Sequence, residues 1–460
     1  MEEKLTYDDL KLGELAKEAY ENGAPVEEII KLPTYLNTRH VFLNLNVTDL
    51  GRAADIAGLN RMMIGRPGTG KSQWLRDTYN RYFGGNIADG GQGIFIRCRQ
   101  DMDVYNEVLT KLNVKEADRE KTKNIDALIY GGDELNRAPT IEQNQLFPLG
   151  DGIFDVKGRS MTLGREGYHI FIATANVGNG DYKGTFEIDL GFYDRIPVII
   201  DLNYSMYQPT DEEEMLIDKI KAANPKIKEC EPADISTKIL AANKEISRQL
   251  VNPGIEFWAV INYLRFGLRN CMEESGKRKE KNWYDKCRTC EKNPDEETLC
   301  SLIEAPARRM QNSIIRYAAA LNYLAKLKDE NVKVNAVDLV FKAFEITGAY
   351  QFLLNPHILK SRYQGQNPKM MADVVSKLKE DFRANEDFIM ASAEEAERGK
   401  EVTRFFKKKN DKGEDVIGNY DDENLDDKVR AKFEPIEPYK GERPVRLGWM
   451  PIFIKVNKKK

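Results

Sequence analysis

One segment near the start of the chain has the residues and spacing of a phosphate-binding loop. Its eight residues fit the pattern G-x-x-x-x-G-K-[ST]. In such a loop the glycines let backbone N–H groups turn towards the phosphates, the lysine reaches the β- and γ-oxygens, and the hydroxyl binds Mg²⁺. The candidate residues are Gly65, Arg66, Pro67, Gly68, Thr69, Gly70, Lys71 and Ser72. Apolar residues precede the loop and a helix-compatible stretch follows it, so we expect it to bind ATP and Mg²⁺ between a strand and a helix.

A pair of neighbouring carboxylates further along the chain could complete a site for ATP hydrolysis. Asp133 and Glu134 follow an apolar run at residues 127–130 and two glycines. At the end of a buried strand, the first carboxylate can hold the metal and the second can take the proton of the attacking water. An ordinary surface Asp-Glu pair is the alternative. Because few surface pairs close an apolar strand downstream of a phosphate-binding loop, we predict that Asp133 binds Mg²⁺ and that Glu134 is the general base.

The residues around these carboxylates resemble a known family of ATPases. Residues 133–139 are similar to the D-E-[IL]-N-R-A-P stretch of MoxR-type AAA+ ATPases, and the similarity spans about residues 45 to 350. Four segments carry it: Asp133-Glu134-Leu135-Asn136-Arg137-Ala138-Pro139, Gln143 with Leu146, Thr174-Ala175-Asn176, and Tyr193-Asp194-Arg195-Ile196. The pair Gly131-Gly132 departs from the family, which usually has an apolar residue and Ala there.

This resemblance implies roles for two further residues. By the likeness, Asn176 orients the attacking water or the γ-phosphate, and Arg195 is the arginine finger offered to the nucleotide of the neighbouring subunit. The chemistry agrees, because a loose phosphoryl transition state needs fixed donors and a cation near its spreading negative charge. The alternatives are that Asn176 caps a turn and that Arg195 pairs locally with Asp194.

Two further segments resemble the family, but the roles of their residues have alternatives. Residues 305–309 are similar to the S-P-R that begins the sensor 2 helix of the family, but with one extra residue. By the likeness, Arg308 or Arg309 contacts the γ-phosphate, whereas both could instead pair with carboxylates such as Glu304. Residues 154–167 resemble the hairpin that the family inserts ahead of the sensor 1 strand, where such hairpins often touch substrate; an ordinary connecting hairpin is the alternative.

Four of the six cysteines are gathered in a short stretch with the spacing C-x15-C-x2-C-x9-C. They are Cys271, Cys287, Cys290 and Cys300. Thiolates suit zinc, and a polar insertion without its own core would gain folding free energy from a bound metal. We therefore predict a Zn²⁺ site, with an iron–sulfur cluster and unligated cysteines as alternatives. The other two, Cys98 and Cys230, are expected to be buried thiols.

The motifs at residues 65–72 and 133–134 require elements that bring them together. Five short β-rich runs alternate with helical stretches, which predicts a parallel sheet with both faces covered. The runs are residues 61–64, 94–97, 127–130, 169–174 and 197–202. We predict an α/β fold in which a P-loop AAA+ parallel-sheet domain at 45–205 precedes an α-helical lid domain at 206–350, with the cysteine insertion at 271–300. A helical N-terminal extension at 1–44 and an α+β C-terminal extension at 351–460 flank these domains.

Composition restricts the class of protein further. The chain has 460 residues, of which 41% are hydrophobic and 31% charged, and a formal net charge of -4. No apolar run approaches the ~20 residues needed to cross a bilayer, and the first residues have no apolar signal region, so we expect a cytoplasmic protein without a membrane partner. The charge balance neither suggests nor excludes a local nucleic-acid surface.

Together these observations predict a MoxR-like AAA+ ATPase that hydrolyses ATP at the subunit interfaces of a homo-oligomeric ring, with a hexamer favoured. The resemblance implies a protein client that is remodelled or assembled, with a von Willebrand factor A domain protein as the candidate. The alternative is a nucleic-acid-associated AAA+ motor or translocase, favoured if the cysteine insertion holds an iron–sulfur cluster. A third hypothesis, a scaffold that binds nucleotide without hydrolysing it, is disfavoured by the presence of Glu134 and Arg195.

Overall fold

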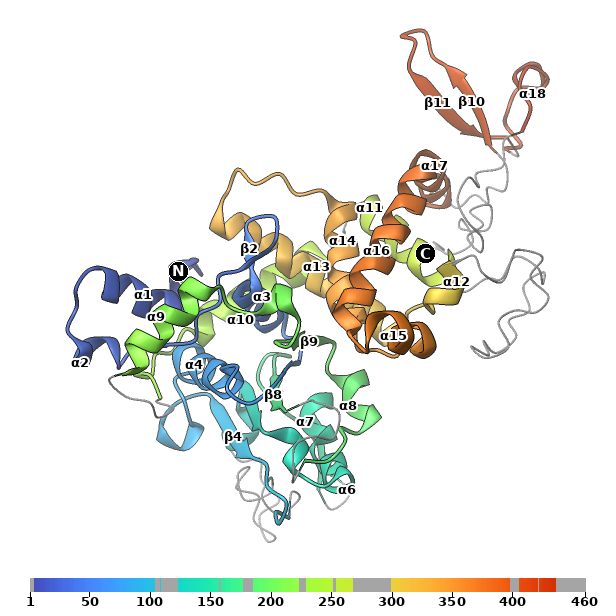
Figure 1. Ribbon diagram of the computed structural model, residues 1–460. Coiled ribbons are helices and arrows are strands. Elements are labelled where there is room, and N and C mark those ends of the chain that lie inside the picture. The colour runs from blue at the N-terminus through green and yellow to red at the C-terminus, as the bar shows by residue number, and fades with distance from the viewer. Residues whose placement is uncertain are drawn as a thin grey trace. The chain divides into compact units, whose positions relative to one another are not determined.

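The chain forms two compact units, each described here by itself (Figure 1). The first consists of residues 1–250 and 316–333, and the second of residues 251–315 and 334–460. The computed structural model describes residues 4–103, 108, 123–156, 159–176, 185–222, 229–250, 254–267, 299–397, 405–420 and 422–435. The helical region predicted at residues 206–350 contributes to both units.

The first unit contains a five-stranded parallel sheet with the order β4-β5-β8-β3-β9. The strands are β3 (Arg61–Ile64), β4 (Gly93–Arg97), β5 (Ile129–Asp133), β8 (Ile170–Ala175) and β9 (Val198–Asp201). Each predicted β-rich run is found as one of these strands, and the mixed α/β class is confirmed. Almost every strand residue is buried, as expected for a parallel sheet that is covered on both faces.

The register of the sheet places the ends of three strands at one edge. Ile64 of β3 is opposite Ala175 of β8, and Gly132 of β5 is opposite Ala173. Parallel strands that end together present the residues that follow them to the same crevice, where ligands of open α/β sheets bind. The candidate loops after β3, β5 and β8 therefore meet at the carboxyl edge of the sheet.

Helices and short hairpins surround this sheet. Helix α3 (Val47–Ala57) begins at a capping box in which Asn46 and Asp49 exchange side-chain-to-backbone hydrogen bonds, and it ends at the left-handed Gly58. The remaining helices are α1 (Gly13–Glu21), α2 (Val26–Ile29), α4 (Lys71–Phe83), α6 (Thr140–Gln143), α7 (Phe147–Asp151), α8 (Leu190–Arg195), α9 (Asp211–Ala222), α10 (Ser236–Gln249) and part of α13 (Arg308–Lys328). The 3-10 helices are Asp8–Leu10, Ile87–Asp89, Lys123–Asp126, Leu135–Arg137, Asn144–Leu146 and Ser205–Tyr207. Two hairpins are formed by β1 (His40–Phe42) with β2 (Leu45–Asn46) and by β6 (Ile153–Val156) with β7 (Arg159–Thr162). The hairpin predicted within residues 154–167 is thus present as β6 and β7.

The N-terminal segment packs against the helix that follows the phosphate-binding loop. The Tyr35 ring stacks on the Trp74 ring with centroids 4.5 Å apart. The backbone N–H groups of Thr34 and Tyr35 both donate to Asp77 Oδ2, at 2.9 and 2.7 Å. Because Asp77 is buried on α4, these bonds attach residues 34–35 firmly to that helix.

The second unit is mainly helical. Its core includes an aromatic cluster of Tyr263, Phe341 and Phe382, and the Tyr263 hydroxyl donates to Asp381 Oδ2 at 2.7 Å. The helices are α11 (Ile255–Asn262), which continues into a π-turn at Tyr263–Gly267, α12 (Leu299–Leu302), the start of α13, α14 (Ala336–Gly348), α15 (Pro356–Tyr363), α16 (Asn367–Ala384), α17 (Glu386–Glu397) and α18 (Asp427–Arg430). A hairpin of β10 (Phe405–Lys409) and β11 (Asp415–Asn419) follows α17 in the sequence.

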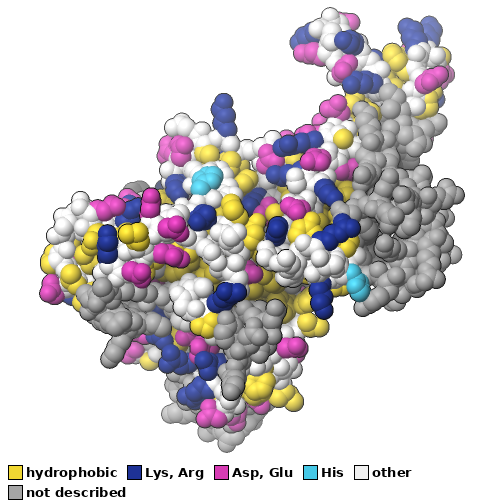
Figure 2. Space-filling model, in the orientation of Figure 1, with side chains coloured by type: hydrophobic (Ala, Val, Ile, Leu, Met, Phe, Trp, Pro, Cys, Tyr) yellow, Lys and Arg dark blue, Asp and Glu magenta, His cyan; other side chains and the backbone are white. Residues whose placement is uncertain are grey.

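Charged side chains of both signs are mixed on the face of the molecule that Figure 2 shows. Figure 2 shows basic and acidic side chains interspersed over the described residues of the visible face, in keeping with a formal net charge of -4. Among the helices that the structure describes, none combines the length and the apolar character that a membrane span requires.

Candidate nucleotide-binding site

The phosphate-binding loop connects β3 to α4 and depends on glycine at two of its positions. Gly68 and Gly70 have φ angles of 87° and 81°, in the left-handed region that favours glycine. A Cβ on Gly70 would also lie 3.1 Å from the Tyr35 ring, so a side chain there would press on the N-terminal segment. The loop therefore adopts a conformation that its glycines permit, and α4 begins directly at Lys71.

Lys71 lies within the loop, with 6% of the residue exposed. Its Nζ donates to the carbonyl oxygens of Gly65 and Arg66, at 2.9 and 2.5 Å, and to Thr69 Oγ1 at 3.2 Å. Burial lowers the pKa of Lys71 to about 8, although nearby carboxylates, Asp133 first among them, act in the opposite direction. The ammonium group is thus held inside the ring of backbone groups that would face a phosphate chain.

A hydroxyl and a carboxylate meet beside this lysine at the edge of the sheet. Ser72 Oγ, from the first turn of α4, donates to Asp133 Oδ1 at 2.7 Å, and Asp133 is 1% exposed at the end of β5. Thr174 Oγ1, from β8, donates to the same carboxylate oxygen at 2.7 Å. Mg²⁺ prefers such oxygen ligands and usually keeps several waters, so Ser72 and Asp133 fit the two protein ligands predicted for it.

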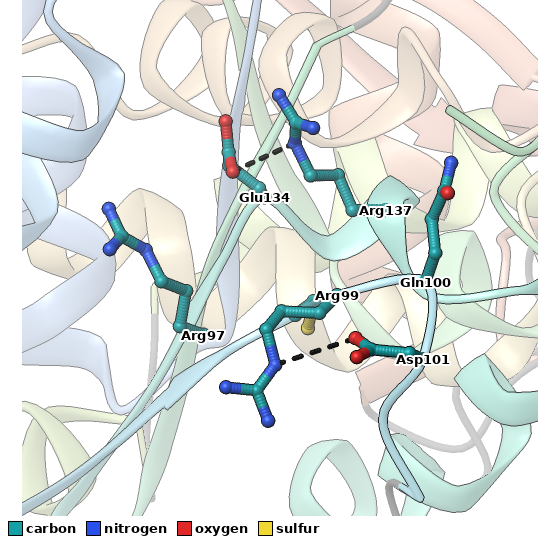
Figure 3. A pocket seen from close by; sticks show the side chains of 7 residues that line it. Arg97, Arg99, Gln100, Asp101, Glu134 and Arg137 are labelled. Carbon is teal, nitrogen blue, oxygen red and sulfur yellow. Dashed lines mark ion pairs between the residues drawn. The ribbon is translucent and has the colours of Figure 1, made fainter. Parts of the chain in front are cut away.

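Glu134 occupies a strained position directly after Asp133. Its φ and ψ angles of 56° and 47° are left-handed, which is uncommon for a residue with a side chain. Its backbone N–H donates to Thr174 Oγ1 at 2.8 Å, which fixes this conformation. Its carboxylate points towards Arg137, with Oε2 lying 2.9 Å from Nε (Figure 3). The Glu134 carboxylate is thus paired with Arg137, three residues further along the chain.

Asn136 and Asn176 tie the ends of β5 and β8 together. Asn136 Nδ2 donates to the backbone oxygen of Asn176 at 2.7 Å, and the backbone N–H of Asn176 donates to Asn136 Oδ1 at 3.1 Å. This reciprocal pair positions the backbone of the predicted sensor Asn176 against the turn that bears Glu134. Sequence reasoning assigned no role to Asn136 or Thr174, although both lie inside the segments that carried the family resemblance.

Arg195 is held on a different surface of the same unit, at the end of α8. Its Nε donates to Asp151 Oδ2 at 2.8 Å, its Nη1 donates to the Gly191 oxygen at 3.0 Å, and its guanidinium lies 4.3 Å from the Phe147 ring centroid. The local ion pair is thus formed with Asp151 and not with the neighbouring Asp194. Among the described residues, these side-chain contacts all lie on α7 and α8, and none is with the phosphate-binding loop.

Other predicted site residues belong to the second unit or lie outside the described residues. Arg308 and Arg309 are exposed where α13 begins, in the second unit, and their sensor 2 role stays a prediction. Cys271, Cys287 and Cys290 lie outside the described residues, and Cys300 is placed only by its backbone, in α12. The described residues contain no group of three or more His, Cys, Asp or Glu that could hold a metal. Cys98 and Cys230 are buried free thiols, as predicted.

The chain was compared with protein-family models, curated proteins and solved structures. No protein-family model matches the chain, and no curated protein does. Among solved structures, the chain is similar to a protein of Cytophaga hutchinsonii described as a candidate ATPase, with a TM-score of 0.45 and 15% sequence identity. The match covers 71% of this chain and 87% of that one. At this distance the functional assignment of the chain rests on the geometry of its own site.

Proposed function

We propose that the chain is a P-loop ATPase that binds ATP and Mg²⁺ at the carboxyl edge of its parallel sheet and hydrolyses the γ-phosphate. The observation that carries the proposal is the meeting of Ser72 and Asp133 beside the Lys71 loop, through the 2.7 Å hydrogen bond between their side chains. A hydroxyl and a carboxylate at this place, next to a lysine and a glycine-rich loop before a helix, are what a magnesium-bound triphosphate requires.

Each group has a distinct task in this proposal. The loop N–H groups and Lys71 bind the phosphates. Ser72 and Asp133 would hold Mg²⁺, and the bound cation would neutralise the negative charge that develops on the phosphate oxygens. Glu134 orients the attacking water and takes its proton once its carboxylate turns from Arg137 towards the γ-phosphate. Asn176 supplies a donor to the water or the γ-phosphate, and the Asn136 pair supports this by fixing its backbone.

The finer part of the proposal is a MoxR-like AAA+ ring in which Arg195 completes the site of a neighbouring subunit. It is supported by the contacts of Arg195, which hold the guanidinium on α7 and α8 and not at the loop of its own chain. A cation in such a position can serve a phosphate only if another subunit brings one to it. The energy would then remodel or assemble a protein client.

The direct test is Mg²⁺-dependent ATP hydrolysis by the purified chain, compared with the Lys71→Ala variant. We expect hydrolysis in the wild type, and in the variant a loss of ATP affinity of roughly 100-fold or more, because the lost ammonium makes charge-assisted bonds to two phosphates. Lys244→Ala, on the exposed face of α10, is the matched control and should leave the affinity unchanged. Wild-type protein that binds no ATP with Mg²⁺ would contradict the proposal.

A further inference from the structure

A pocket of about 660 Å³ lies beside Glu134, between the residues at the end of β4 and the turn that follows β5 (Figure 3). Seven residues line it: Arg97, Cys98, Arg99, Gln100, Asp101, Glu134 and Arg137. The lining holds three arginines and two carboxylates, which leaves one excess positive charge. Arg97 is the last residue of β4 and is opposite Asp133 in the sheet register, so the pocket adjoins the proposed magnesium site. This surplus of cationic groups favours an anionic ligand.

Most N–H groups of these arginines are available to a ligand. Arg97 makes no hydrogen bond or ion pair with any residue that the structure describes. Arg99 Nε is 3.8 Å from Asp101 Oδ1, between side chains that are both well exposed. Each guanidinium carries five N–H donors in a planar fork that matches phosphate and carboxylate oxygens. The two carboxylates in the pocket therefore use only a small part of its donor capacity.

The ion pair between Glu134 and Arg137 is one that a competing anion could replace. The Arg137 Nε atom is buried and lies 2.9 Å from the carboxylate, but without the alignment of a hydrogen bond. The side chains of Glu134 and Arg137 are 29% and 43% exposed, so both can rotate. The backbone of Glu134, in contrast, is fixed by its bond to Thr174 Oγ1. Only the side chain of Glu134 would need to move.

We propose that this pocket is a binding site for inorganic phosphate, the anion that the proposed ATPase reaction would release at the adjoining magnesium site. Phosphate is favoured over a carboxylate because it offers four oxygens to three guanidinium forks, whereas a carboxylate offers two. Its identity as the reaction product rests on the proposed function, but the binding itself does not. Phosphate in the pocket binds Arg137 in place of Glu134 and so links product release to the position of the general base.

The test is a calorimetric titration of the full chain with inorganic phosphate, made separately for three variants. Lys71→Ala removes the lysine of the phosphate-binding loop, and the double variant Arg97→Gln with Arg99→Gln removes two exposed arginines of the pocket. The matched control, Lys244→Gln with Arg248→Gln, removes two exposed cations from α10. We expect phosphate to bind Lys71→Ala and the control as it binds the wild type, and to bind the double pocket variant at least tenfold more weakly.

Two results would overturn this proposal. One is phosphate binding that is lost in Lys71→Ala but unchanged in the double pocket variant, because the phosphate then occupies only the nucleotide loop. The other is an absence of phosphate binding in the wild type. Thermal unfolding of the double variant checks that it is folded, which is expected because both side chains are exposed. A wild-type chain that binds phosphate in this pocket but hydrolyses no ATP would refute the proposed function while leaving the anion site intact.

Discussion

The carboxyl edge of the sheet and the surface of α7 and α8 hold their candidate groups in different ways. At the sheet edge, hydroxyls from α4 and β8 converge on one oxygen of Asp133 from β5. On α7 and α8, the Arg195 side chain contacts Asp151, Gly191 and Phe147, which are groups of these two helices. The first arrangement is assembled within one chain. In the proposed ring, the second would act on the nucleotide of a neighbouring subunit, so the two regions are proposed to serve different sites.

The largest effect on ATP hydrolysis is expected from Arg195→Ala, which tests whether the two regions act in different subunits. This variant should bind ATP normally and lose hydrolysis by about 10³-fold, because an arginine finger stabilises the transition state and not the bound nucleotide. Mixing it with Lys71→Ala subunits should restore activity, since each defective subunit contributes one intact half of a shared site. The measurement is the ATPase rate of the mixture against that of each variant alone.

The control for this mixture is Arg248→Ala, an exposed arginine on α10 that should keep the wild-type rate. Lys71→Ala mixed with Glu134→Gln should not recover, because both residues are proposed to act in the same site. Unrestored activity in Arg195→Ala mixtures that demonstrably assemble would show that the two regions do not act in different subunits.

A smaller effect, on the free energy of unfolding, is expected from Thr174→Val. This variant tests how the groups at the carboxyl edge of the sheet are held in place. The substitution keeps the shape of the side chain but removes the donor to Asp133 Oδ1 and the acceptor of the Glu134 N–H group. Leaving a largely buried amide without a partner should lower the free energy of unfolding by about 1–3 kcal/mol. Urea unfolding of this variant measures the loss.

Thr140→Val is the matched control for this substitution, because its hydroxyl donates at the exposed surface, to the Glu187 oxygen at 3.1 Å. Its free energy of unfolding should change by no more than about 0.5 kcal/mol. Equal losses in the two variants would mean that the hydroxyl of Thr174 has no special part in holding Asp133 and Glu134.

The smallest expected effect concerns the pH dependence of ATP binding. Burial lowers the pKa of Lys71 to about 8, so the free protein loses this proton as the pH rises through 8. The phosphates of ATP bind the protonated form of Lys71. The affinity for ATP is therefore near its maximum at pH 7 and should fall about tenfold between pH 7 and pH 9. In Lys71→Arg, whose guanidinium does not titrate in this range, ATP binding should be independent of pH. A wild-type affinity for ATP that does not change up to pH 9 would contradict the attribution of the pH dependence to Lys71.

Much of the first unit could be predicted because its signals are local in the sequence. The five strands are short apolar runs between helical stretches, and the spacing of glycines and Lys71 specifies a loop whatever surrounds it. Asp133 was assigned because a carboxylate at the end of an apolar strand is unusual. The position of Ser72 beside it follows from the order of elements, since both lie where parallel strands end.

The rest depends on contacts between segments that are far apart in the sequence. Thr174 lies inside an apolar strand, so the sequence alone indicates no role for it beyond the strand. The pairing of β5 with β8 brings its hydroxyl to Asp133. The stacking of Tyr35 on Trp74 likewise joins two distant segments. For Arg195, the nearest carboxylate in the sequence is Asp194, but neighbouring helical residues point in different directions, and Asp151 of α7 is the partner.

The proposed ATP hydrolysis depends most directly on Glu134 as the group that activates water next to a magnesium-bound nucleotide. The decisive measurement compares ATP binding and single-turnover hydrolysis of Glu134→Gln with those of the wild type, using Glu142→Gln on α6 as the control. We predict that Glu134→Gln binds ATP and Mg²⁺ with wild-type affinity and hydrolyses it at least about 100-fold more slowly, while Glu142→Gln behaves as the wild type. Hydrolysis by Glu134→Gln at the wild-type rate would contradict the proposed role of Glu134 in activating water.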